Sequence, residues 1–82
     1  MSTKLHVGNI SSAVAEDDLR AAFGKFGRVD TVEIARDAIT GLSKGFAVVA
    51  MSRYEDAVNA AERLILTHYA GRTIGVSQSS ES

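Results

Sequence analysis

The chain of 82 residues contains no cysteine, no proline and no tryptophan. Without cysteine it can form neither a disulfide nor a thiolate metal site, which is compatible with a reducing compartment. Without proline there is no rigid segment to mark a linker, and the length suits a single small domain. An apolar share of 45% is enough to build one compact core.

Long apolar runs are also missing. No segment is long enough to cross a bilayer, and no charged-then-apolar leader is seen. We therefore expect a soluble, unexported protein that makes no membrane contact. We expect it to be intracellular and cytoplasmic, and a nuclear location is also compatible with the sequence.

Excess positive charge is the third absence. Nine basic residues face ten acidic ones, and the formal net charge is −1. Affinity for a nucleic-acid backbone comes largely from lysine and arginine, which displace counterions from phosphates. The charge balance therefore weighs against strong general binding of nucleic acid, although it leaves room for a local basic patch.

Residue patterns for catalysis or metal binding are sparse. His6 and His68 lie far apart in the chain and have no cysteine near them, so we predict no metal site and no cofactor. The acidic residues 16–18 suit the positive end of a helix dipole better than acid–base chemistry. Residues 24–27 lack the spacing of a phosphate-binding loop. We expect that the protein is not an enzyme and has no catalytic residues.

The hydrophobic periodicity predicts six elements in the order βαββαβ. A first helix should begin near Glu16 and end at Gly27, a residue suited to a left-handed cap. Its apolar positions form one stripe at helical spacing: Leu19, Ala22, Phe23 and Phe26. The predicted strands cover residues 4–9, 29–36, 44–51 and 71–76, and residues 37–43 form a turn-bearing loop.

The second helix should begin at Ser52-x-x-Glu55, which matches a capping box. It should bury Ala57, Ala60, Ala61 and Leu64. We expect it to continue for one further turn through Ile65 and Leu66. In the second strand Val32 and Ile34 should face inward, as should Ile74 and Val76 in the last strand.

Several motifs occur in order along the chain. Residues 5–10 read Leu-His-Val-Gly-Asn-Ile, and residues 44–51 read Lys-Gly-Phe-Ala-Val-Val-Ala-Met. The second segment fits the pattern basic-Gly-aromatic-small-aromatic-Val-x-aromatic except at its fifth and eighth positions. Three further motifs are Asp18-Leu19-x-x-x-Phe23-x-x-Phe26-Gly27, Asp37-x-x-Thr40-Gly41-x-Ser43-Lys44-Gly45-Phe46 and Gly71-Arg72-x-Ile74-x-Val76.

With these motifs, residues 3–77 resemble the RNA recognition motif (RRM) family. The resemblance implies an α+β fold of the ferredoxin-like βαββαβ type, with two helices on one face of a four-stranded antiparallel sheet. The other face would be open to water. Residues 78–82 would form a short disordered tail.

The resemblance also implies where RNA would bind, because family members stack bases on the two central strands. His6 and Val48 take the two stacking positions, and Phe46 takes the position that packs against sugar and base. Val48 lacks a π-face, so the contribution of about one stacked base, about 1–3 kcal/mol, is missing. We therefore expect modest affinity.

Other positions carried over from the family lie around these three. Lys44 would meet a phosphate, Asn9 would hydrogen-bond either a base or loop backbone, Arg36 would add charge at an edge, and Glu33 would repel phosphate. The full predicted RNA-binding set is His6, Asn9, Glu33, Arg36, Lys44, Phe46, Val48, Ser77 and Gln78.

Two functions stay open at this point. The first is a monomer that binds single-stranded RNA, or alternatively single-stranded DNA, on the open sheet. The second is the same fold used for protein contact or self-association, through the apolar loop residues Ile39 and Leu42 or through the sheet. In the second case the sheet would not carry RNA.

Overall fold

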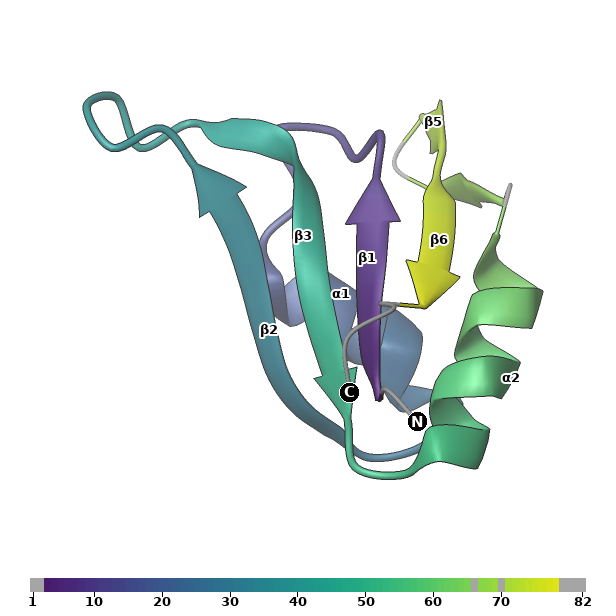
Figure 1. The fold of residues 1–82 in the computed structure, drawn as a ribbon. Helices are drawn as coiled ribbons and strands as arrows, with labels where there is room; N and C mark the ends of the chain where they lie inside the picture. Colours follow the sequence, from purple (N-terminus) through teal and green to yellow (C-terminus); the bar gives the residue numbers. More distant parts are fainter. Residues whose placement is uncertain (1–2, 66, 70, 79–82) are drawn as a thin grey trace.

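The computed structural model describes residues 3–65, 67–69 and 71–78. Figure 1 shows the expected order of elements, with one short hairpin added before the last strand. No helix in these described ranges is long and apolar enough to cross a membrane. The elements are β1 (Lys4–Gly8), α1 (Glu16–Gly24), β2 (Val29–Arg36), β3 (Ser43–Met51), α2 (Tyr54–Leu64), β4 (His68–Tyr69), β5 (Arg72–Thr73) and β6 (Gly75–Gln78).

Four strands form one antiparallel sheet in the order β2-β3-β1-β6. The α1 helix lies behind this sheet in Figure 1, and α2 packs against β6, β3 and β1. The predicted α+β architecture is therefore confirmed. Since β1 and β3 occupy the centre of the sheet, residues from opposite halves of the sequence lie next to each other.

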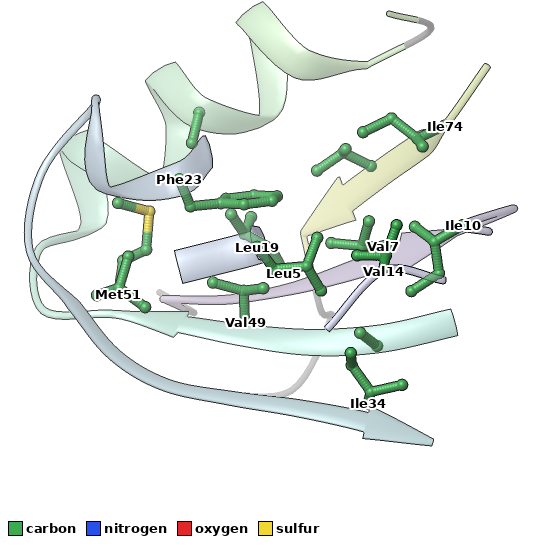
Figure 2. Close-up of a cluster of buried hydrophobic side chains, with 14 of the residues drawn as sticks. Leu5, Val7, Ile10, Val14, Leu19, Phe23, Ile34, Val49, Met51 and Ile74 are labelled. Carbon is green, nitrogen blue, oxygen red and sulfur yellow. The ribbon is translucent and has the colours of Figure 1, made fainter. Parts of the chain in front are cut away.

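The core fills the space between the sheet and the helices. Figure 2 shows Leu5 and Val49 from the central strands beside Leu19 and Phe23 of α1. Phe23 is fully buried, and Ala22 and Phe26 pack against the core as partly buried residues. The predicted helical stripe is confirmed.

The small residues of α2 let it approach the sheet closely. Ala57 and Ala60 are fully buried, and Ala61 and Leu64 are partly buried against the core. The predicted inward residues of the strands also lie in or against the core: Val32, Ile34, Ile74 and Val76. Alternation along the strands thus assigns the two faces of the sheet correctly.

The start of α1 is as predicted, but its end is not. Ala15 is the N-cap, and its amide donates to the Asp18 carboxylate at 2.9 Å, which compensates for the missing polar side chain. The helix ends at Gly24 with Lys25 as a right-handed C-cap. The expected cap at Gly27 is wrong. That glycine lies in the following turn, where a Cβ would collide with Asp56.

The expected capping box at Ser52 is also wrong. The Ser52 hydroxyl donates to Asp30 of β2, and Arg53 is the N-cap without a side-chain hydrogen bond. At the other end, Ile65 has extended backbone geometry, so the predicted further turn does not form. Thr67 closes the helix instead, because its hydroxyl donates to the Leu64 carbonyl at 2.7 Å. Leu66 lies outside the described residues.

The expected last strand at residues 71–76 is divided in two. Residues 72–73 pair with β4, whereas residues 75–78 pair with β1. The division falls at Ile74, whose amide donates to the Thr67 carbonyl at 3.0 Å. Gln78 is the last residue of β6, and residues 79–82 of the expected tail lie outside the described residues.

Candidate nucleic-acid interface

The open face is the side of the four-stranded sheet that the helices leave uncovered, and residues from all four strands form rows across it. One row joins four positions in register: Glu33, Val48, His6 and Ser77. In the next row Phe46 pairs with Gly8, and Gly8 pairs with Gly75. The sheet thus brings five of the predicted site residues onto one surface.

Phe46 is the large aromatic side chain of this surface and is 50% exposed. Its cross-strand partner Gly8 has no side chain, and neither has Gly75 beyond it, so the sheet is hollowed next to the ring. The resulting groove has a volume of about 490 Å³. It is lined by His6, Val7, Gly8, Phe46, Ala47, Ile65, Gly75, Val76 and Ser77. An aromatic wall above a bare backbone floor suits a flat ring.

Ile65 was predicted only to continue the second helix, and it was not among the predicted residues of this surface. It follows α2 directly, is 46% exposed, and lines the groove with Phe46 and Ser77. The signal in the sequence is an apolar residue at the end of the second predicted helix. Only the packing of α2 beside β6 shows that this residue reaches the groove.

A second, smaller hollow lies over β2 and β3. Its volume is about 130 Å³, and it is lined by Glu33, Ile34, Ala35, Phe46, Ala47 and Val48. Phe46 lines both hollows. The ring therefore borders two concave places on the open face.

Gly45 determines the path of β3 just before Phe46. Its φ of 89° is a conformation that glycine adopts at little cost and that other residues rarely adopt. Its carbonyl accepts the Ile10 amide at 3.0 Å, which ties the start of β3 to the chain leaving β1. Lys44, two residues before Phe46 on the same strand, is exposed, and the irregular pairing of β2 with β3 at this point interrupts the alternation between the two residues.

The side chain of Asn9 is held by the protein itself. Its Nδ2 donates to the Thr73 carbonyl at 2.7 Å, and its Oδ1 accepts from Arg72 at 3.2 Å. The φ of Asn9 is 59°, which asparagine tolerates better than most residues. Asn9 thus links the end of β1 to the strand β5, and its predicted hydrogen bond to a base stays a prediction.

Arg36 and Gln78 lie away from the centre of the open face. Arg36 donates to Glu16 of α1 at 3.0 Å and to the Gly41 carbonyl at 3.3 Å. The pKa of Glu16 is lowered first by a hydrogen bond from its own backbone amide and then by Arg36. Gln78 pairs with Leu5, so alternation assigns it to the helix side of the sheet.

The loop between β2 and β3, at the upper left in Figure 1, is held by Asp37. Its carboxylate accepts the amides of Ile39 and Thr40, each at 2.9 Å, which lowers the pKa of Asp37. Ile39 is 94% exposed and Leu42 65% exposed. The loop therefore presents apolar side chains to solvent, apart from both hollows.

Within the ranges that the structure describes, no group of three or more His, Cys, Asp or Glu side chains is arranged to hold a metal ion. The prediction that no metal site exists concerns the whole chain and stays a prediction.

Known proteins with similar sequences share this segment. The chain is 34% identical over its whole length to an uncharacterized RNA-binding protein of Schizosaccharomyces pombe, of which it spans 28%. It is 48% identical over 58 residues to one of the subunits of eukaryotic translation initiation factor 3 from Caenorhabditis elegans. That match covers 71% of this chain and 22% of the nematode protein. The chain thus spans about a quarter of the length of these relatives.

Solved structures with similar folds cover nearly the whole chain. The crystal structure of the RNA-binding protein PG1 superposes with a TM-score of 0.94 at 33% identity, covering 99% of this chain and 98% of that one. The Sxl-lethal protein/RNA complex gives a TM-score of 0.93 at 27% identity, covering 100% of this chain and 49% of that one. The family model for the RNA recognition motif matches residues 5–75, and the chain belongs to this family.

Proposed function

We propose that this protein binds single-stranded RNA across its open face. The observation that carries the proposal is the half-exposed Phe46 ring, which stands between two hollows in the centre of the sheet. A base can stack on such a ring without sequence preference, because every base has a π-face. Membership in the family and the similarity to a chain solved with RNA support the same function.

Modest affinity is part of this proposal. Val48 offers apolar contact but no ring, and the registered neighbours His6 and Glu33 add a weaker stacking group and a negative charge. Arg36 is paired with Glu16, which reduces the positive charge available to phosphates. Single-stranded DNA has the same kind of stacking bases and charged phosphates, so we expect it to compete for the surface.

An amide-shift titration with a pool of short single-stranded RNA oligomers tests this function directly. We expect the largest shifts at residues 5–9 and 44–50, with smaller ones at residues 33–36, 77 and 78. Ile65 should also shift, since it lines the groove. Shifts confined to the helical side, around Ala22 or Ala60, would be incompatible with binding on the open face.

Protein contact through the β2–β3 loop is the second candidate function. Ile39 and Leu42 are strongly exposed on a loop that Asp37 holds in one conformation, so presenting them costs little further ordering. A rise in mass with protein concentration in the absence of RNA, abolished by Ile39→Ser, would favour self-association. A constant monomer mass would favour the RNA-binding monomer that we expect.

The similarity to subunits of a translation initiation factor agrees with the cytoplasmic location that the sequence suggested. Because the match covers only part of those proteins, this location belongs to the proposal. Fractionation of cells that make the protein, with detection in the cytoplasmic and nuclear fractions, tests it.

A further inference from the structure

Among the residues that line the smaller hollow, Glu33 alone carries an ionisable side chain. The residue is exposed, and its carboxylate makes no side-chain hydrogen bond or ion pair with the residues that the structure describes. Two arginines at the edges of the sheet are engaged elsewhere: Arg36 bonds Glu16, and Arg72 bonds Asn9. The Glu33 carboxylate is therefore available to a ligand in the hollow.

The register places Glu33 within reach of a base on the sheet. Glu33 and Val48 are cross-strand partners, and such pairs have Cβ atoms about 4.5–5.5 Å apart. Phe46 lies two residues before Val48 in β3, on the same face of the sheet, and lines the same hollow. A base that stacks on Phe46 from this side covers Val48 and turns one edge toward the carboxylate.

A carboxylate distinguishes base edges because it has only acceptors. Guanine offers two neighbouring donors, N1–H and the 2-amino group, on its Watson–Crick edge. In uracil, adenine and cytosine, each donor on that edge has an acceptor beside it, which would face the second carboxylate oxygen. A paired, charge-assisted hydrogen bond to guanine is stronger than a single one.

We propose that Glu33 makes the smaller hollow selective for guanine. This inference rests on the proposed function, since it requires RNA on the open face. It also accounts for a negative charge on a surface that meets phosphates: the carboxylate lowers general affinity and stabilises one base in the bound state. The protein would then bind most RNA sequences with low affinity. Its selectivity among them would be higher than its stacking residues suggest.

Four five-nucleotide RNAs test the inference: UUGUU, UUIUU with inosine, UUAUU and UUUUU. Fluorescence anisotropy with the 82-residue chain at one salt concentration gives their dissociation constants. UUGUU should bind about fivefold or more tightly than UUUUU, the low end of the discrimination by a paired contact. Inosine lacks the 2-amino group, so UUIUU should fall between them.

Glu33→Gln changes the hydrogen-bonding pattern with little change in shape. Glutamine offers one acceptor and one donor, a pair that the Watson–Crick edges of guanine, adenine and uracil can all satisfy. The preference for UUGUU over UUAUU and UUUUU should therefore be lost. Glu62→Gln removes the same charge from an exposed position on α2 and should leave the order of the four RNAs unchanged. Glu33→Asp keeps the two acceptor oxygens on a shorter side chain. The order of affinities should stay the same, with a smaller ratio between the dissociation constants of UUUUU and UUGUU.

Two results would overturn the inference and leave the proposed function standing. If Glu33→Gln raises the affinity for all four RNAs by one common factor, Glu33 acts only by repelling phosphate. If UUGUU and UUUUU bind wild type equally while amide shifts appear on the open face, the hollow does not select guanine, although the proposed function stands. Absence of any shift on the open face with all four RNAs would instead reject the proposed function, and the inference with it.

Discussion

His6 and Val48 are cross-strand partners in the β1–β3 ladder, so an imidazole and an isopropyl group stand side by side at the centre of the open face. Phe46 lies two residues along from Val48 on the same strand. The middle of the surface therefore combines one full aromatic ring, one histidine and one aliphatic group. Stacking capacity should follow that order, which makes each position separately testable.

Phe46→Ala should weaken RNA binding more than any other single truncation on the sheet, by about 1–3 kcal/mol, because it removes the one phenyl ring there. The fold should persist, since the side chain is 50% exposed. Anisotropy titration measures the first effect and thermal unfolding the second. Ile39→Ala removes exposed apolar surface outside both hollows and serves as the control. Unchanged affinity of the Phe46 variant would contradict the proposed function.

Val48→Phe should strengthen RNA binding by up to about 1–3 kcal/mol, because it supplies the stacking ring that this position lacks. The side chain is only partly buried, so a larger group can extend over the sheet. The measurement is the ratio of dissociation constants for one RNA with variant and wild type. A correctly folded variant with wild-type affinity would indicate that bases do not cross this part of the sheet.

The salt dependence of binding should be shallow. Few basic side chains surround the open face, so we expect two or three phosphates to be neutralised. For single strands the slope of log K against log salt is about −0.7 per phosphate, which gives roughly −1.5 to −2. For an RNA without guanine, such as UUUUU, Glu33→Lys should raise affinity mainly at low salt, where charges are least screened. A slope near −5 would require a basic surface that the sheet does not present.

Gly27→Ala should destabilise the fold. A Cβ at Gly27 would lie 2.7 Å from the Cβ of Asp56, so the turn after α1 and the start of α2 would have to separate. We expect a loss of about 1–3 kcal/mol, as for other overpacked sites. Gly24→Ala is the matched control: its Cβ meets nothing within 4 Å, and a helical alanine should add about 0.5–1 kcal/mol. Urea unfolding compares the two, and equal midpoints would contradict the contact.

Stability should fall on acidification through the two perturbed carboxyl groups. In the folded protein the pKa of Asp37 is lowered by the amides of Thr40 and Ile39, and that of Glu16 by its own amide and by Arg36. A lowered folded-state pKa stabilises the fold above the unfolded-state pKa, and this is lost as pH falls through the folded value. The Asp37→Asn variant should therefore be less stable than wild type near neutral pH, and it should lose less stability than wild type on acidification.

The measurement is the urea midpoint as a function of pH from neutral into the acid range. Asp17→Asn, an exposed change in the first turn of α1, controls for the loss of one negative charge. If the urea midpoint falls with pH at the same slope for Asp37→Asn and for wild type, the hydrogen bonds of the Asp37 carboxylate contribute nothing to folding stability.

Local features of the sequence were predicted well where neighbouring residues decide the outcome. Alternation identified the buried faces of the strands, and helical spacing identified Leu19 and Phe23 of α1. Errors arose where a distant residue competes. Ser52 has the sequence context of a capping residue, but its hydroxyl bonds Asp30, which is 22 residues away. Gly27 has the context of a helix cap but makes room for Asp56.

The candidate site divides in the same way. The sequence by itself determined the family, the strand faces, and the shared surface of His6, Phe46 and Val48, because alternation and motif order are local properties. The tertiary structure decided that Gly8 and Gly75 floor a groove, that Ile65 lines it, and that Arg36 turns to Glu16. These contacts join residues far apart in the chain, and only strand register and helix packing bring them together.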